Sequence, residues 1–454
     1  MNEKEGRLLT KYKKQLALAE NKGYIIYMLF VLSMVYIIDE ISSNIYSALQ
    51  SDMVTEFYVN GMGLEFNTGL ATYSAMTAPL YAIMIITPFY KSLADKFGRK
   101  LFLALNTVGM GFGMFVCMMA PNPVTYICGI GIIYFLMGND IQVLYVMETA
   151  PEKHRAKLTS ITKAIALLGV TFIPILRDIF MKNDGSQWQK VFMIPAIVGM
   201  IIGIISFFIM PETPTYMKNK IAKLEKTEDA NVEEKKSADE SDGGVIPALK
   251  FIFKHKQTRA VLLCAFIYMT STGGTSYYES IMKTGGMSTS DITTAMYFIP
   301  VVNAIMTGLS GFITDYLGRK GSTIYHACFA LVGLVSFIFT SSSNVAPALV
   351  GICYGLFIGG LWSACDILFI MIPGESSPTN LRMSVVGTMS ILSGVGSVLS
   401  IAIMTVGMLF VESIGLLCLC VCVPFLVISL IILITKVHET KGVDLSTVTG
   451  SEWD

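Results

Sequence analysis

Twelve long apolar runs dominate the sequence and leave few folds open to it. A helix needs about 20 mostly apolar residues to cross the hydrocarbon core of a bilayer. The runs form two sets of six, near 24–48, 68–90, 101–120, 123–147, 158–180 and 190–211, and near 258–282, 291–313, 322–341, 344–371, 383–409 and 413–436. Only 15% of the residues are charged, where soluble domains average about 25%. The sequence therefore predicts an all-α membrane protein with twelve transmembrane helices.

The segments around these runs divide the chain into five parts. A polar tail covers 1–23, an N-terminal six-helix bundle 24–211, a linker 212–256, a C-terminal six-helix bundle 257–436 and a second tail 437–454. The linker has mixed charge and low hydrophobicity, which is typical of a solvated segment. Its part VIPALKFIFKHKQ places apolar residues at helical spacing beside lysines. This part either lies on the membrane as an amphipathic helix or simply leads into the seventh span.

The basic residues predict an orientation. Lys and Arg gather in the first tail, in 91–100, in 153–157 and in the linker, whereas 49–66 has acidic residues but no Lys or Arg. By the positive-inside rule, we expect both termini and the linker to be cytoplasmic. The plasma membrane is the expected location.

Several function classes find no support in the residues. A formal net charge of zero gives no indication of nucleic-acid binding. The four histidines are dispersed, and we see no nucleophile with a base, no metal cluster and no phosphate loop. All nine cysteines lie inside apolar runs, so we expect no disulfide framework, and we interpret the closely spaced cysteines of 418–422 as helix filling. We therefore expect neither an enzyme nor a cofactor or metal.

A charged turn with a glycine occurs twice. DKFGRK at 95–100 follows the second run, and DYLGRK at 315–320 follows the eighth, about half a chain length later. ETAPEKHR at 148–155 ends the fourth run in the same way that ESSPTNLR at 375–382 ends the tenth. Parallel repeats of this kind are typical of secondary transporters, whose site lies between the halves near the membrane midplane.

These motifs resemble those of a known family. Residues 311–320 match the G-x-x-x-D-x-x-G-R-K signature of the major facilitator superfamily, and the first copy has Lys91 in place of the leading glycine. PETPTYMKNK at 211–220 and HETKGVDL at 438–445 resemble the P-E-S-P-R and P-E-T-K-G signatures of its sugar porter branch, with Thr215 for Arg and His438 for Pro. The resemblance implies two pseudo-symmetric six-helix bundles, transport by alternating access, and a monomer.

The repeated turn is interpreted as part of a cytoplasmic gate, because such networks close that side in the superfamily. Glycine lacks a Cβ and permits the tight bend, and the aspartates of the turns can accept bonds from N–H groups at a neighbouring helix start. Arg99 and Arg319 can pair with Glu148 and Glu375. A plain anchor at the lipid headgroups is the alternative. The predicted gate residues are Asp95, Gly98, Arg99, Glu148, Arg155, Asp315, Gly318, Arg319, Glu375 and Arg382.

Four acidic residues lie well inside predicted spans, away from their ends. An ionised side chain at the bilayer centre costs roughly 2.5–3.5 kcal/mol or more, so we expect each of these acidic residues to have a specific role. They are Asp39, Glu40, Asp140 and Asp366, on the first, fourth and tenth spans, which line the cavity in the superfamily. Asp39 matches the acid that sugar porters use in proton coupling, and we predict that all four take part in it. The alternative for Asp39 and Glu40 is helix capping or a place in a water-filled vestibule. The alternative for Asp140 and Asp366 is a structural hydrogen bond.

The predicted substrate site combines one cation with hydroxyls and aromatic rings. Lys163, in the fifth span, can pair with Asp140 or hold a substrate carboxylate. YMTSTGGTSYYES at 268–280 and a nearby tryptophan can hold a polar organic solute, and close helix packing is the alternative for this segment. The predicted substrate-binding residues are Lys163, Thr272, Thr275, Tyr277, Tyr278 and Trp362. Arg177 and Asp178, near the outer end of the fifth span, are interpreted as an interfacial pair.

The site departs from the sugar porter pattern in places. Cys128 replaces the usual arginine of the fourth span, and Ile267, Tyr268 and Gly273 replace amides of the seventh. We nevertheless predict a proton-coupled symporter for a small polar solute of the sugar or polyol type. The alternative is a transporter of charged organic solutes, meaning a carboxylate, an organic cation or a drug, as symporter or antiporter.

Overall fold

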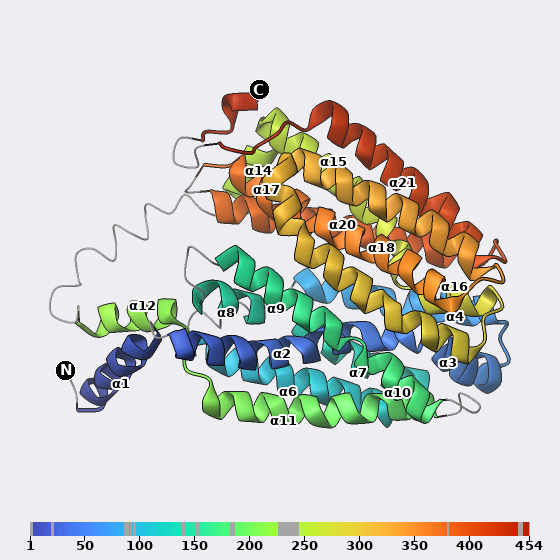
Figure 1. Cartoon of the computed structure of the whole chain (residues 1–454), viewed down its shortest axis with the longest axis horizontal. Coiled ribbons are helices and arrows are strands. Elements are labelled where there is room, and N and C mark those ends of the chain that lie inside the picture. Colours follow the sequence, from blue (N-terminus) through green and yellow to red (C-terminus); the bar gives the residue numbers. More distant parts are fainter. Residues whose placement is uncertain are drawn as a thin grey trace. The chain divides into compact units, whose positions relative to one another are not determined.

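The computed structural model is a set of closely packed helices, and its described part contains no strand (Figure 1). The structure describes residues 3–19, 22–85, 90, 93, 97–137, 141–149, 155–181, 187–225, 245–378, 381–443 and 448–453. The predicted all-helical membrane fold is thus confirmed. The packing gathers the chain into two units. Unit 1 comprises residues 1–43, 82–170 and 192–241, and unit 2 comprises 44–81, 171–191 and 242–454.

Unit 1 is built around two helices that share glycine contacts. Its elements are α1 (Glu3–Ala19), most of α2 (Lys22–Ala48), α6 (Arg99–Met118), α7 (Pro123–Met137), α8 (Ile141–Thr149), α9 (Arg155–Gly169), α11 (Met193–Ile209) and α12 (Pro214–Glu225). α6 and α11 approach so closely that a Cβ on Gly111 would lie 2.8 Å from the carbonyl oxygen of Ala196. Such contacts between small residues are a common way to pack helices in membranes. α2, α6 and α8 enclose an apolar core that includes Leu32, Phe102 and Tyr145.

Unit 2 contains the longest helices and several short ones. Its elements are α3 (Gln50–Val54), η1 (Thr55–Asn60), α4 (Phe66–Thr77), α10 (Phe172–Phe180), α14 (Val245–Lys254), α15 (Lys256–Thr270), η6 (Ser271–Thr275), α16 (Tyr278–Thr284), α17 (Thr289–Ser341), α18 (Pro347–Asp366), η7 (Ile367–Met371), α19 (Ile372–Glu375), α20 (Arg382–Gly407), α21 (Ile414–Lys436) and η8 (Ser451–Trp453). Two further 3-10 segments, η2 (Ala78–Ile85) and η4 (Trp188–Phe192), cross between the units.

α17 contains the second charged turn. Its two helical halves meet at Gly318, whose φ of 80° and ψ of 177° are not helical. The eighth and ninth predicted spans therefore lie on the two halves of α17. We call the end of unit 2 at Gly318 and α19 the inner end. The opposite end, where α16, the start of α17 and the start of α18 lie, is the outer end.

Among the residues that the structure describes, seven helices are long and apolar enough to cross a membrane: Gly23–Ala48, Arg99–Met118, Trp188–Ile209, Thr289–Ser341, Pro347–Glu375, Ser384–Gly407 and Ile414–Lys436. Pro123–Met137 is apolar but shorter. The second, fifth and seventh predicted spans fall on shorter pieces. The seventh is broken at η6, whose sequence STGGT has weak helix formers. The count of twelve spans and the division into bundles at 24–211 and 257–436 stay predictions, as does the surface role of α14.

Candidate functional site

Asp39 is a buried carboxylate in the middle of α2, with 6% of its surface exposed. The amide nitrogen of Gln142, on α8, donates a 2.9 Å hydrogen bond to its Oδ2. A primary amide carries both donors and an acceptor. Gln142 can therefore donate to an ionised Asp39 or accept from a protonated one after the amide rotates. This pair suits a carboxyl group that binds and releases a proton.

The other predicted proton-coupling residues lie in different surroundings. Glu40 is half-buried on α2, and Asp366 is half-buried at the end of α18. A π-helical segment, η7, follows Asp366 directly, and such segments are frequent at functional sites. Asp140 lies outside the described residues. Lys163 is half-buried on α9, and its predicted pairing with Asp140 stays a prediction.

The threonines of the broken seventh span use their hydroxyls within the protein. Thr272 Oγ1 donates to the carbonyl of Met269 at 2.7 Å and lies 3.2 Å from Ser397 Oγ. Thr275 Oγ1 donates to the carbonyl of Thr272 at 2.8 Å. Hydroxyls that bond to a preceding carbonyl still have lone pairs with which to accept. Both threonines therefore keep an acceptor for a polar solute.

The aromatic residues of the predicted substrate site divide into two groups. Tyr277 is buried and donates to Ser74 Oγ at 3.0 Å. Tyr278 is buried and stacks on Tyr354, with ring centroids 4.6 Å apart. Trp362 differs, because 39% of its surface is exposed. The two tyrosines therefore belong to the packed interior of unit 2, and the tryptophan does not.

At the inner end of unit 2, a carboxylate from the C-terminal tail holds the charged turn. The backbone N–H groups of Arg319 and Lys320 donate to the two oxygens of Glu439 at 2.8 and 3.0 Å. The expected contact of Arg319 with Glu375 is present, with Nη2 and Oε1 2.7 Å apart. Thr440 Oγ1 also donates to Glu375, at 2.6 Å. The HETKG segment thus joins the turn and α19 into one polar network.

The first turn, in unit 1, repeats this arrangement with Glu212. The backbone N–H groups of Arg99 and Lys100 donate to Glu212 at 3.1 and 3.3 Å. The Arg99 guanidinium lies 5.9 Å from the centre of the Tyr216 ring. Gly98 precedes them with a φ of 111°, as Gly318 precedes the second pair with a φ of 80°. In each copy, a glutamate of the branch-signature segment (PETPTY or HETKG) therefore binds the backbone N–H groups of the charged turn.

The remaining gate predictions have mixed outcomes. Asp315 is exposed, and Glu439 binds the N–H groups that follow its turn, whereas the expected bond of Asp315 to a neighbouring helix start stays a prediction. Arg382 donates to the carbonyls of Gly374 and Ser377. Asp95 lies outside the described residues, as do the side chains of Glu148 and Arg155. The gate function of the whole set stays a prediction.

Glu439 supports the inner end in a pH-dependent way. Burial alone would raise the pKa of its carboxyl group, but the backbone N–H groups of Arg319, Lys441, Lys320 and Thr440 outweigh this and lower the pKa below its ordinary value of 4.5. The ionised carboxylate therefore stabilises the fold above pH 4.5, and this contribution is lost as the pH falls through the lower folded-state pKa.

We expect Glu439→Gln to destabilise the protein at pH 7 by about 1 kcal/mol, a figure reduced for solvent screening at this exposed position. The check is the melting temperature of the purified protein at pH 7 and at pH 4. The difference from wild type should shrink at the lower pH. The matched control is Glu412→Gln, at an exposed position of the same unit. This variant should have the wild-type melting temperature at both pH values. An equal loss at both pH values would contradict the role of the charge.

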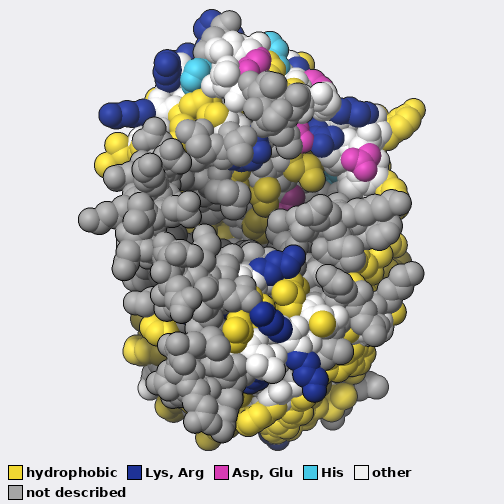
Figure 2. Space-filling model, turned by 90° about the vertical axis from the view of Figure 1, so that its left-hand side faces the viewer, with side chains coloured by type: hydrophobic (Ala, Val, Ile, Leu, Met, Phe, Trp, Pro, Cys, Tyr) yellow, Lys and Arg dark blue, Asp and Glu magenta, His cyan; other side chains and the backbone are white. Residues whose placement is uncertain are grey.

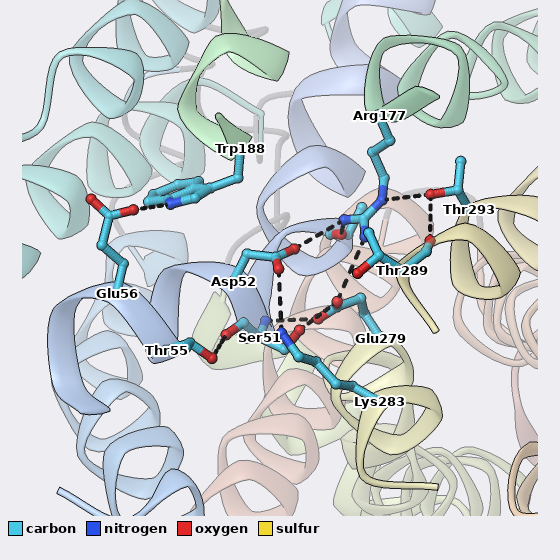
Figure 3. Close-up of polar contacts among 11 residues, drawn as sticks. Ser51, Asp52, Thr55, Glu56, Arg177, Trp188, Glu279, Lys283, Thr289 and Thr293 are labelled. Carbon is cyan, nitrogen blue, oxygen red and sulfur yellow. Dashed lines mark hydrogen bonds and ion pairs between the residues drawn. The ribbon is translucent and has the colours of Figure 1, made fainter. Parts of the chain in front are cut away.

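Sequence reasoning missed a cluster of charged residues at the outer end of unit 2 (Figure 3). Arg177 contacts Asp52 and Glu279, and Lys283 contacts Asp52. The interpretation of Arg177 and Asp178 as a pair is wrong, because Asp178 instead accepts a bond from Tyr297. Adjacent residues of a helix point about 100° apart and do not face each other. The sequence did contain one indication of this cluster, since its four charged residues stand near the outer ends of predicted spans.

The family can now be identified. Residues 28–401 match the Major Facilitator Superfamily. The chain belongs to this superfamily. It is accordingly an integral, multi-pass membrane protein.

Several membrane transporters are similar to this chain in sequence. The glucose transporter GlcP of Staphylococcus epidermidis is 22% identical over 68% of this chain and 72% of its own length. The arabinose-proton symporter of Bacillus subtilis is 23% identical over 66% of this chain and 69% of its own length. The cis,cis-muconate transport protein of Acinetobacter baylyi is 22% identical over 74% of this chain and 78% of its own length.

Solved structures of the superfamily share the fold. A partially occluded, inward-open structure of the xylose transporter XylE from E. coli matches with a TM-score of 0.66 and 16% identity, over 93% of this chain and 99% of that one. A crystal structure of a D-xylose-proton symporter matches with a TM-score of 0.67 and 16% identity, over 92% and 99%. The predicted resemblance to the major facilitator superfamily and its sugar porters is confirmed.

Proposed function

We propose that this protein is a secondary active transporter that moves a sugar or polyol across the membrane by alternating access, in symport with protons. The names of its relatives support this proposal, since they include a glucose transporter and an arabinose-proton symporter. The observation that carries the proton part is the buried carboxylate of Asp39 with its Gln142 partner. A carboxyl group that is exposed to each side of the membrane in turn can carry one proton in each cycle.

The predicted site residues take their roles within this scheme. Asp39, with Glu40, Asp140 and Asp366, binds the coupled proton. The solute lies against the broken seventh span, where Thr272 and Thr275 offer hydroxyl oxygens. Lys163, Tyr277, Tyr278 and Trp362 complete the substrate-binding set. The networks of Arg319 with Glu375 and of Arg99 with Glu212 each hold the charged turn of their own unit, and no step requires a cofactor or a catalytic group.

We also propose that the inner side is cytoplasmic, that both termini lie there, and that the protein acts as a monomer in the plasma membrane. Lys and Arg side chains lie scattered over the face shown in Figure 2. Exposed lysines of unit 2 at its inner end include Lys254 and Lys441, and unit 1 has exposed lysines of its own at Lys13 and Lys218. Such an excess of basic residues is typical of the cytoplasmic side.

The test uses purified protein in liposomes that contain a pH-sensitive dye. Sugars, polyols, carboxylates and organic cations are added one at a time to the outside. We expect a sugar or polyol to drive protons inward, and we expect no such signal in liposomes without protein or with the Asp39→Asn variant. Proton movement with a carboxylate or a cation alone would overturn the substrate class. Sugar entry without proton movement would overturn the coupling.

A further inference from the structure

The outer cluster consists of four charged side chains that are largely shielded from water. Arg177 and Glu279 have side chains that are only 1% exposed, and that of Asp52 is 9% exposed. Lys283 lies at the rim, with 36% of its side chain exposed. The cluster contains two acids and two bases, so its formal charges balance. Buried charges are costly unless they are paired, and removing one partner of a buried pair typically costs about 3–5 kcal/mol.

Arg177 lies at the centre of this cluster (Figure 3). Its Nη1 donates to the carbonyl of Ala48 at 2.5 Å and lies 3.4 Å from Asp52 Oδ2. Its Nε donates to Thr293 Oγ1 at 3.3 Å, and its Nη2 lies 3.9 Å from Glu279 Oε1. The planar guanidinium thus uses all three of its nitrogen atoms. It connects the end of α2 with α3, α16 and α17.

Two of the charged groups hold a break in the first span. α2 ends at Ala48, and α3 begins at Gln50, because Leu49 leaves helical geometry with a φ of −120° and a ψ of 14°. Arg177 donates to the carbonyl at the end of α2, where a positive charge is favoured. Glu279 accepts from the backbone N–H of Ser51 at 2.7 Å, and also from its hydroxyl, at the start of α3. A cation and an anion from other helices therefore satisfy the two sides of the break.

The cluster also joins parts of the chain that are far apart in sequence. Ser51, Asp52 and Arg177 precede the central linker, whereas Glu279 and Lys283 follow it. Beside them, Ser280 Oγ donates to Gln50 Oε1 at 3.0 Å, which is a further contact between these two parts of the chain. All of these residues belong to unit 2, and their contacts join its helices at the outer end. A solute that entered from this end would have to separate these contacts.

We propose that Ser51, Asp52, Arg177, Glu279 and Lys283 form the outer gate of this transporter. In the closed state the gate seals the outer end of the solute path and fixes the break at Leu49. When the outer end opens, Arg177 leaves the end of α2 and Glu279 leaves the start of α3, so the bend of the first span changes with the gate. This proposal depends on the proposed function only in assuming that the protein works by alternating access.

The test measures how often the outer end opens. Ser47, which is buried on α2 beside the break, is changed to Cys in a background where the exposed Cys128, Cys328 and Cys420 are Ser. A membrane-impermeant thiol reagent is added to either side of sealed vesicles, and its rate of reaction is compared between gate variants. We expect Glu279→Gln to raise the rate from the outer side on the order of tenfold. The matched control is Glu65→Gln, an exposed acid before α4, with the rate expected within about twofold of the parent.

A second variant keeps the test decisive if Glu279→Gln does not fold. Lys283→Met removes a charge at the rim, where the side chain can reach water, and it should raise the rate in the same direction by a smaller factor. Folding is checked by size-exclusion elution. Unchanged labelling in every folded gate variant would overturn the gate. Because labelling needs no transported solute, a positive result with no sugar transport would instead overturn the proposed function alone.

Discussion

Replacing Asp39 with Asn should abolish solute-driven proton movement and leave the exchange of solute across the membrane intact. Asparagine has nearly the same shape as aspartate, and its amide can still hydrogen-bond to Gln142, which lies 2.9 Å from the carboxylate in the native protein. The substitution therefore removes the titratable group from the interior of unit 1 and little else. Net uptake against a gradient should fall to the level of empty liposomes, because no proton binds with the solute.

Two measurements on the same proteoliposomes check this prediction. Dye fluorescence reports proton entry, and counterflow of labelled solute reports exchange without net proton movement. Asp178→Asn is the matched control, since Asp178 is an exposed acid that contacts Tyr297, and it should retain both activities. If protons still entered with the solute through Asp39→Asn, another group would carry them. If exchange were lost as well, Asp39 would serve binding or folding.

Local repeats made the inner end predictable. Hydropathy alone located the long helices, and the two charged turns indicated that Gly98 and Gly318 occupy equivalent bends. The contact of Arg319 with Glu375 followed from the position of each residue at a helix end within the repeat. In each case the signal lies within a short stretch of sequence, or in two stretches that resemble each other.

Contacts between distant segments left no such signal. Glu212 and Glu439 stand in recognised motifs, yet their role depends on segments after α11 and α21 that fold back onto the turns. At the outer end, Ser51 and Glu279 meet across 228 positions. The break at Leu49 was equally invisible, because hydropathy does not register a helix that stops and restarts. The burial of a charged side chain determines whether it must be paired, and burial can be known only from the folded structure.

Gly318→Ala should be among the most destabilising single-methyl changes in the chain. With a φ of 80° and a ψ of 177°, Gly318 occupies backbone space that is essentially closed to other residues, at a cost of about 1–3 kcal/mol. A Cβ there would also lie 2.5 Å from Glu439 Oε2. Glu439 would have to move and give up its bonds to Arg319 and Lys320. We expect a total loss of roughly 3 kcal/mol in the free energy of unfolding.

The measurement is the thermal or denaturant midpoint of the detergent-purified variant, with two companions. Gly387→Ala, on α20, is the matched control, because a Cβ there would have no neighbour within 4 Å, and alanine should stabilise that helix by up to about 1 kcal/mol. Gly98→Ala should behave like Gly318→Ala, since its φ is 111° and a Cβ would collide with Glu212. If both turn variants matched the Gly387→Ala control, neither carboxylate would hold its turn, and the equivalence of the two copies would have no energetic basis.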